Sequence, residues 1–306
     1  MINSDYSYNN LKRRNFIKNT LATAGLVIAG PVISKASGYL NSNSTFTVKQ
    51  IINSFISEVP GGAIANTVDT LKAGSQDTVV TGIVTTMFAT IDIIKKAISL
   101  GANFIIVHEP TYYNHADETN WLQKDDVFKF KMDLLNKHQI AVWRNHDYIH
   151  HLNPDGVTMG VLNQLEWQKY SDKSIPNLVN MPDITLNALI LQIKEKLNIE
   201  RVRYIGSIDQ SCSRILFLPG AAGGQNQIAA ISKYKPDVII CGEISEWETA
   251  EYVRDAKEVG QNIALVVVGH IASEEPGSEY MAAWLHDKFP AVKTQHLSAG
   301  NSLRFL

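Results

Sequence analysis

Short apolar runs alternate with amphipathic segments along most of this 306-residue chain. The runs are rich in β-branched residues, which is typical of buried strands. The segments between them repeat apolar residues at helical spacing, as at Val48, Ile51, Ile52, Phe55 and Ile56. Strands that alternate with helices predict βαβ units and a parallel or mixed sheet. We therefore expect an α/β fold.

The alternation occurs twice, before about residue 165 and after about residue 184. The predicted strands are 78–87, 103–107, 140–143, 202–205, 215–218, 238–241 and 263–268. The predicted helices are 45–58, 91–100, 127–138, 184–197, a segment through 228 and 231, 247–259 and 280–285. We expect two similar α/β lobes with mixed sheets flanked by helices, over 39–165 and 166–306. The polar stretch 166–183, with Pro176 and Pro182, is predicted to be a linker.

The N-terminus carries a twin-arginine pattern, Lys12-Arg13-Arg14-Asn15-Phe16-Ile17-Lys18. An apolar stretch of about 14 residues follows, which is too short to span a bilayer comfortably. Ser34-Lys35-Ala36 then offers a cleavage site. We predict that 1–38 is a twin-arginine export signal, so that the protein is periplasmic or in the cell envelope, with no stable membrane span after removal. An uncleaved anchor or a chance arginine pair are the alternatives.

Composition restricts the possible partners. The net charge is −2, and 45% of the residues are hydrophobic. Nucleic-acid binding would require a basic patch, and the sequence predicts none. Cys212 and Cys241 do not form a CxxC pair. We expect both to be buried structural thiols, with a disulfide between them as the alternative in an exported protein.

Polar side chains follow two of the predicted strands. His270 and Glu274 come after 263–268, and His108 and Glu109 come directly after 103–107. Ligands in open α/β sheets bind at the carboxyl ends of the strands. Two strands that end in histidine with a nearby carboxylate therefore predict one shared metal site.

Further candidates follow the other strands: His146, His150 and His151 after 140–143, and Glu243 and Glu246 after 238–241. Imidazole and carboxylate together suit Zn, Mn, Fe, Co or Ni. Three histidines and two carboxylates exceed what one catalytic zinc needs, but they suffice for two metals. The remaining histidines are predicted to be surface residues: His115, His138, His286 and His296. Gly223-Gly224 predicts a tight turn, with a phosphate cradle as the alternative.

Three short motifs in the last third of the chain resemble those of one family. They are Leu218-Pro219-Gly220-Ala221-Ala222-Gly223-Gly224, similar to a PGxGG turn; Cys241-Gly242-Glu243-Ile244, similar to TGE or TGD; and Gly269-His270-Ile271-Ala272-Ser273-Glu274, similar to the metal motif GHxxxE. The family is the Nif-three-like dinuclear-metal, hexamer-forming proteins called GTP cyclohydrolase 1 type 2 homologues. The resemblance covers about 46–306. It implies a Nif-three-like fold, with His270 and Glu274 as metal ligands.

The first half departs from the family pattern. His108-Glu109-Pro110 stands where the family has His-His-Pro, and His146-Asp147-Tyr148-Ile149-His150 stands where it has HTNLD. One histidine has become glutamate and one aspartate has become histidine, so the ligand count is preserved. The resemblance thus implies two divalent metal ions (Zn, Mn, Fe, Co or Ni) held by five residues: His108, Glu109, His150, His270 and Glu274. His151 is the alternative to His150, and Trp247 stands where family members tend to carry histidine.

The resemblance implies an exported metal-dependent hydrolase, cyclohydrolase-like, with a small-molecule substrate that the sequence does not identify. His146 is expected to act as a proton shuttle or to support a ligand, since it lies one helical turn from His150. Glu243 is a candidate general base or a residue that orients a ligand, and a structural role at a helix start is the alternative. A non-catalytic metal-binding or interaction protein of the cell envelope is the rival function. The resemblance also implies a homo-oligomer, a hexamer.

Overall fold

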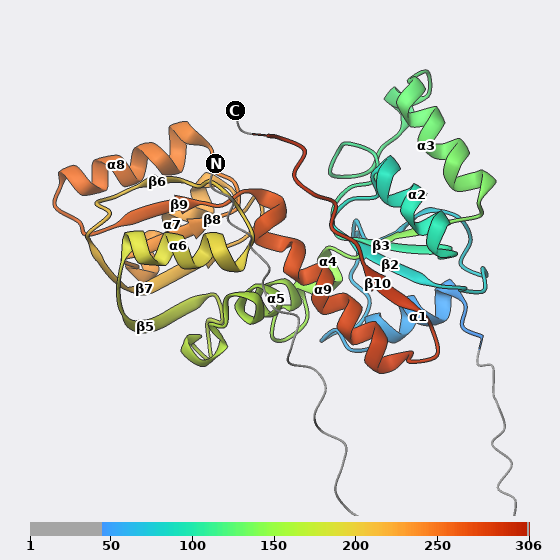
Figure 1. Ribbon diagram of the computed structural model, residues 1–306, viewed down its shortest axis with the longest axis horizontal. Coiled ribbons are helices and arrows are strands. Elements are labelled where there is room, and N and C mark those ends of the chain that lie inside the picture. Colours follow the sequence, from blue (N-terminus) through green and yellow to red (C-terminus); the bar gives the residue numbers. More distant parts are fainter. Residues whose placement is uncertain (1–44, 305) are drawn as a thin grey trace, which may run out of the picture. The chain divides into compact units, whose positions relative to one another are not determined.

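The computed structural model describes residues 45–304 and residue 306 (Figure 1). The predicted export signal lies outside the described residues, so the structure says nothing about it. The residues from 45 onward belong to one compact unit. Within this part of the chain, no helix is long and apolar enough to cross a membrane.

The first of two sheets has the strand order β1-β4-β3-β2-β10. Its strands are β1 (Leu71–Ala73), β2 (Ile83–Thr86), β3 (Phe104–Val107), β4 (Ala141–Arg144) and β10 (Thr294–His296). Strands β4, β3, β2 and β10 are parallel, and β1 is antiparallel to β4. Strand β10 brings residues near the C-terminus into the same sheet as the first strands of the chain. The parallel strands therefore end together at one edge.

Helices cover both faces of this sheet (Figure 1). Helices α1 (Val48–Ile56) and α9 (His270–Lys288) pack on one face, and α2 (Ile91–Leu100) and α3 (Asp126–Lys137) pack on the other. The central strands are fully buried, which explains why they read as continuous apolar runs. Gly101 ends α2 in a left-handed conformation, one residue after the predicted end of the helix at residue 100.

The second sheet has the order β5-β7-β8-β9-β6. Its strands are β5 (Leu178–Thr185), β6 (Arg203–Ile205), β7 (Ser211–Leu218), β8 (Val238–Cys241) and β9 (Ala264–Val267). The three central strands are parallel, and both edge strands are antiparallel to their neighbours. Its helices are α5 (Gly156–Leu165) and α6 (Leu186–Lys196) on one face, and α7 (Gly224–Tyr234) and α8 (Glu251–Glu258) on the other. The predicted class of two similar α/β lobes with mixed sheets is thus confirmed.

Several predicted boundaries were wrong. The segment predicted as a linker contains most of β5, which pairs with β7, and a short 3-10 helix, Gln168–Tyr170. The helix predicted from residue 184 begins at Leu186, because the Thr185 hydroxyl accepts a hydrogen bond from the amide of Ala188 and caps it. The helix predicted over 280–285 is the middle of α9, which already begins at His270. Helix α5 was missed, because its two glycines and Thr158 weaken the helical signal.

Helices α5 and α9 pack against each other at Gly160. A Cβ atom on Gly160 would lie 2.3 Å from the carbonyl oxygen of Pro276, which is backbone and cannot rotate away. Since α9 carries His270 and Glu274, this close approach sets the position of the helix that begins with the two candidate ligands.

The Gly160→Ala variant is therefore expected to push the two helices apart and to lower the free energy of unfolding by about 1–3 kcal/mol. Urea denaturation of the purified protein measures the loss. Asn163→Ala is the control, since it changes an exposed position of the same helix and should stay within about 0.5 kcal/mol of the wild type. Equal stability of the two variants would contradict the packing argument.

Candidate metal centre

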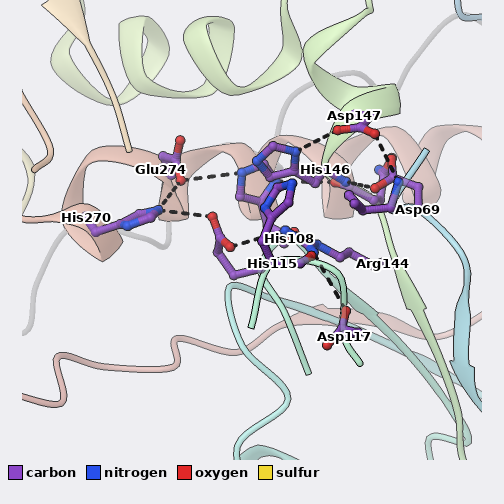
Figure 2. Close-up of polar contacts among 12 residues, drawn as sticks. Asp69, His108, His115, Asp117, Arg144, His146, Asp147, His270 and Glu274 are labelled. Atoms are coloured by element: carbon purple, nitrogen blue, oxygen red, sulfur yellow. Dashed lines mark hydrogen bonds and ion pairs between the residues drawn. The ribbon is translucent and has the colours of Figure 1, made fainter. Parts of the chain in front are cut away.

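The candidate site forms where strands of both sheets end (Figure 2). Strand β3 ends directly before His108 and Glu109, and β4 is followed by Asn145, His146 and the one-turn helix α4 (Asp147–His150). Strand β9 is followed by Gly269, and α9 begins at His270. Because His270 and Glu274 are one turn apart on α9, both side chains lie on one face of the helix. The predicted meeting of strand-end residues from both halves of the chain is present.

Three imidazoles form one group. One ring nitrogen from each of His108, His146 and His150 lies within 4.8 Å of the others. The rings of His108 and His146 stack with centroids 4.8 Å apart, and the His150 ring lies 5.2 Å from that of His108 and 5.0 Å from that of His146. Their ligand nitrogens are close enough together to hold a metal ion. His146, which the sequence placed in a supporting role, is thus as close to the cluster as His150.

Each of these imidazoles contacts an acceptor through Nδ1. His146 Nδ1 lies 3.0 Å from Asp147 Oδ1, and His150 Nδ1 lies 2.8 Å from Asp155 Oδ2. His108 Nδ1 lies 3.3 Å from the carbonyl oxygen of Asn145. Carboxylates and carbonyls accept hydrogen bonds, so a neutral ring carries its proton on Nδ1 and leaves the Nε2 lone pair free. This is the arrangement that supporting residues give to metal-binding histidines.

A second group contains two carboxylates and one imidazole. His270 Nε2 lies 3.1 Å from Glu109 Oε1 and 2.8 Å from Glu274 Oε2. One ligand atom from each of His108, Glu109 and Glu274 also lies within 4.8 Å of the others. Figure 2 shows Glu274 between the rings of His270 and His108. Glu274 therefore touches both groups.

The protonation of the cluster follows from these contacts. Burial opposes the charged form of His270, but the hydrogen bonds and negative charges of Glu109 and Glu274 outweigh it and raise its pKa to about 11. Burial and the neighbouring imidazoles of His108 and His150 lower the pKa of His146 to about 4. A positive charge is thus favoured on His270 between the carboxylates and disfavoured on His146. Burial also opposes the charged form of His150, but the hydrogen bond and charge of Asp155 outweigh it and raise the pKa of that imidazole.

Glu243 lies beside the second group. Its Oε1 is 2.9 Å from Nδ1 of His270, while more than half of its side chain is exposed. This contact directs Nε2 of His270 toward Glu109 and Glu274, which fits the predicted role of a residue that orients a ligand. The alternative ligand His151 is exposed and contacts only the carbonyl oxygen of Asp147 among the hydrogen-bond partners described, so it lies outside both groups.

Two of the histidines predicted as surface residues have other surroundings. His115 is exposed, but its ring lies 6.1 Å from that of His146, beside the cluster. His296 is half-buried in β10, so its surface assignment was wrong; the strand had no recognisable sequence pattern. His138 and His286 are exposed as predicted. Both cysteines are buried and free, which excludes the alternative of a disulfide between them.

A buried arginine supports the second group and was missed by the sequence reasoning. Arg144 is fully buried, and its guanidinium lies 3.5 Å from Glu109 Oε2 and 3.7 Å from Asp117 Oδ2. It also donates to the carbonyl oxygens of His108 and His115. Arg144 is the last residue of the apolar strand β4. A charged residue in a buried strand needs ionic or hydrogen-bonding partners, and this is the sequence signal that could have identified it.

Two aspartates hold α4 and α5 and were also missed. Asp69 is buried and accepts hydrogen bonds from the amides of His146 and Tyr148, at 2.8 and 2.7 Å. Asp155 caps α5 by accepting from the amide of Thr158 through Oδ1, while its Oδ2 contacts His150. Nothing in the sequence signals the role of Asp69. The cap was visible as Asp155-Gly156 before an apolar run.

The glycine-rich turn after β7 packs against the site. A Cβ atom on Gly220 would lie 2.1 Å from Glu274 Oε1, and one on Gly224 would lie 2.3 Å from Glu248 Oε2. The Glu248 carboxylate thus lies beside Gly224 at the start of α7, where a phosphate would have to bind. The structure therefore favours the prediction that Gly223-Gly224 forms a tight turn over the alternative of a phosphate-binding site.

The residues present fit a divalent metal. His108 Nε2 is buried and, among the described residues, makes no hydrogen bond that satisfies the usual geometry; Glu274 Oε2 lies 3.4 Å away. Its Nδ1 contact leaves this atom as an acceptor beside the other ligand candidates. A buried imidazole nitrogen in that state is well suited to coordinate a metal ion. The structure therefore contains His and Glu clusters that could bind metal.

Comparisons with known proteins identify the family of this chain. The family model for Duf34/NIF3 (NGG1p interacting factor 3) matches residues 47–300. A GTP cyclohydrolase 1 type 2 homolog of Clostridium acetobutylicum is 27% identical over 223 residues, which cover 69% of this chain and 79% of the relative. A homolog of the same name from Clostridium perfringens is 26% identical over 220 residues, covering 67% and 78%.

Solved structures share the fold. The hypothetical protein SA1388 of Staphylococcus aureus aligns with a TM-score of 0.70 at 20% identity, covering 86% of this chain and 100% of that one. A Bacillus cereus protein related to NIF3 aligns with a TM-score of 0.65 at 16% identity, covering 86% and 99%. Because the family model matches most of the chain and includes strands of both sheets, the protein belongs to the Duf34/NIF3 family.

Proposed function

We propose that this protein is a metal-dependent hydrolase with a centre for two divalent ions, drawn from Zn, Mn, Fe, Co or Ni. The observation that carries the proposal is the convergence of six side chains whose ring nitrogens and carboxylate oxygens face one another: His108, His146, His150, Glu109, His270 and Glu274. Two such groups side by side match the ligand supply of two-metal hydrolases.

The chemistry divides between the ions and the protein. When bound, divalent ions supply Lewis acidity and an activated water at neutral pH. The protein holds the ligands in place: Asp147 and Asp155 orient two imidazoles, Glu243 orients His270, and Arg144 holds Glu109. Glu243 is also partly exposed, so it is the residue placed to accept a proton from a reacting molecule at the edge of the site.

The substrate proposed is a small molecule with a hydrolysable ring or ester bond. The name of the curated relatives, GTP cyclohydrolase 1 type 2 homolog, supports cyclohydrolase-like chemistry. The twin-arginine pattern supports export to the periplasm or cell envelope, where GTP is scarce, so a substrate other than GTP is expected. The resemblance of the motifs supports a homo-oligomer, a hexamer.

Hydrolysis by reconstituted protein tests the proposal. The protein is stripped with a chelator, reloaded with Zn, Mn, Fe, Co or Ni, and assayed against phosphoesters, amides and cyclic amidines. We expect turnover with at least one ion, and its loss in His270→Ala, because that imidazole contacts both carboxylates of the second group. His151→Ala is the control and should keep full activity, since His151 is exposed and outside both groups.

Inactivity at full metal occupancy would reject the hydrolase and favour a non-catalytic metal-binding protein of the cell envelope. Equal loss of activity in His151→Ala and His270→Ala would show that the clustered residues are not the source of the turnover.

A further inference from the structure

The two ligand groups of the site differ in their donor atoms. The first group is made of imidazoles alone: His108, His146 and His150. The second combines the carboxylates of Glu109 and Glu274 with the imidazole of His270, and the His108 ring also lies within ligand distance of both carboxylates. The first group adds no formal charge when its rings are neutral, and the second adds the charge of two carboxylates.

The supporting contacts preserve the separation. All three rings of the first group present Nε2, because each Nδ1 lies against an acceptor. Asp147 is itself fixed by the Thr67 hydroxyl at 2.8 Å and the Val68 amide at 3.2 Å. In the second group, Arg144 contacts Glu109 Oε2 and leaves Oε1 directed at His270. The two groups meet where Glu274 Oε2 lies 3.4 Å from His108 Nε2, while His146 and His150 have only imidazoles as their fellow ligands in the first group.

Metal ions distinguish such donor sets. Imidazole nitrogen suits Zn, Cu and Ni, whereas carboxylate oxygen suits Mn and other hard ions. A hard divalent cation is also attracted more strongly to a negatively charged group of oxygen ligands than to a neutral group of nitrogen ligands. Affinity alone favours zinc over manganese in either group, so a difference between the groups must appear in competition, with zinc limiting.

We infer that the two groups select different metals, with zinc held by the imidazoles of His108, His146 and His150 and manganese held by Glu109, Glu274 and His270. The inference rests on the proposed two-metal function and assigns its ions. His150 and Glu109 are then the residues that determine metal selectivity in this chain.

Site-resolved metal content tests the inference. Metal-free full-length protein receives one equivalent of zinc and excess manganese and is crystallised, and anomalous scattering is measured at both absorption edges. We expect zinc at the imidazole group and manganese at the carboxylate group, with zinc favouring the first by about tenfold or more. An even division of zinc between the two groups would overturn the inference.

Two variants examine the residues responsible. His150→Asp replaces an imidazole of the first group with a carboxylate and is expected to reduce the zinc preference about tenfold. His151→Asp is its matched control, because it makes the same substitution at the adjacent exposed position and should leave the partition unchanged. An unchanged partition in His150→Asp would contradict the role of His150.

If His150→Asp fails to fold, Asp155→Asn is the second variant that tests the contribution of His150 to zinc binding. Asparagine caps a helix as well as aspartate does, so α5 keeps its start, but the ring of His150 loses its charged acceptor. We expect about tenfold weaker zinc binding, measured by calorimetric titration, with manganese occupancy retained. Equal weakening of both ions would count against separate groups.

The outcomes separate this inference from the proposed function. A protein that hydrolyses a substrate but holds zinc equally in both groups keeps the function and overturns the inference. A protein that separates the ions but hydrolyses nothing keeps the inference and overturns the function. A protein that binds neither ion overturns both.

Discussion

The Gly220→Ala variant is expected to lose metal from the carboxylate group, with affinity reduced about 100-fold. The added Cβ atom would lie 2.1 Å from Glu274 Oε1, and Glu274 is buried too tightly to retreat without leaving His270 and His108. The backbone of Gly220 also has φ +61, which alanine adopts at a cost of about 1 kcal/mol. Metal titration of the purified variant measures the affinity, and urea denaturation measures the stability.

Gly101→Ala separates the two effects. Gly101 has φ +70 with open space around its Cβ position, so this control carries the backbone cost without a clash. It should lose about 1 kcal/mol of stability and no metal affinity. If Gly220→Ala binds metal as well as Gly101→Ala does, the turn after β7 does not position Glu274, and the account of that motif is wrong.

The Arg144→Met variant is expected to show the largest loss of stability, about 3–5 kcal/mol in the metal-free protein. The guanidinium is fully buried between Glu109 and Asp117 and donates to the carbonyl oxygens of His108 and His115. Methionine fills similar volume but leaves these oxygens without their donor, and Lys72 remains as the other cation beside Asp117. The midpoint and slope of urea denaturation give the change in free energy.

Arg203→Met provides the comparison at the surface. Arg203 pairs with Glu246, but both side chains are more than half exposed, so the pair is worth less than about 1 kcal/mol. A loss in Arg144→Met no larger than that in Arg203→Met would mean that the buried network does not hold the loop from His108 to Asp117.

The sequence predicted the part of the fold that depends on local pattern. The buried parallel strands read as apolar runs because helices cover both of their faces, and the residues after those runs met at one edge because parallel strands end together. His270 and Glu274 were recognisable for the same reason, since a helix that begins at the strand end places positions four apart on one face.

The residues that were missed depend on contacts between distant segments. Asp69 holds the start of α4 from 77 residues away in the sequence, and Arg144 reaches Glu109 and Asp117 through the folded loop. Short edge strands such as β10 owe their conformation to a partner strand, not to their own alternation. Helix α5 forms although it contains Gly156 and Gly160, because it packs against α9. Gly160 permits this packing, since a larger residue there would collide with α9. Tertiary packing decided these features.

Anomalous scattering from crystals of the metal-loaded protein shows directly whether these residues hold metal. We expect two adjacent signals, one bounded by His108, His146 and His150 and the other by Glu109, His270 and Glu274. Signals elsewhere, or full-length protein that takes up no metal at saturating concentration, would contradict the claim that these strand-end residues form a metal centre.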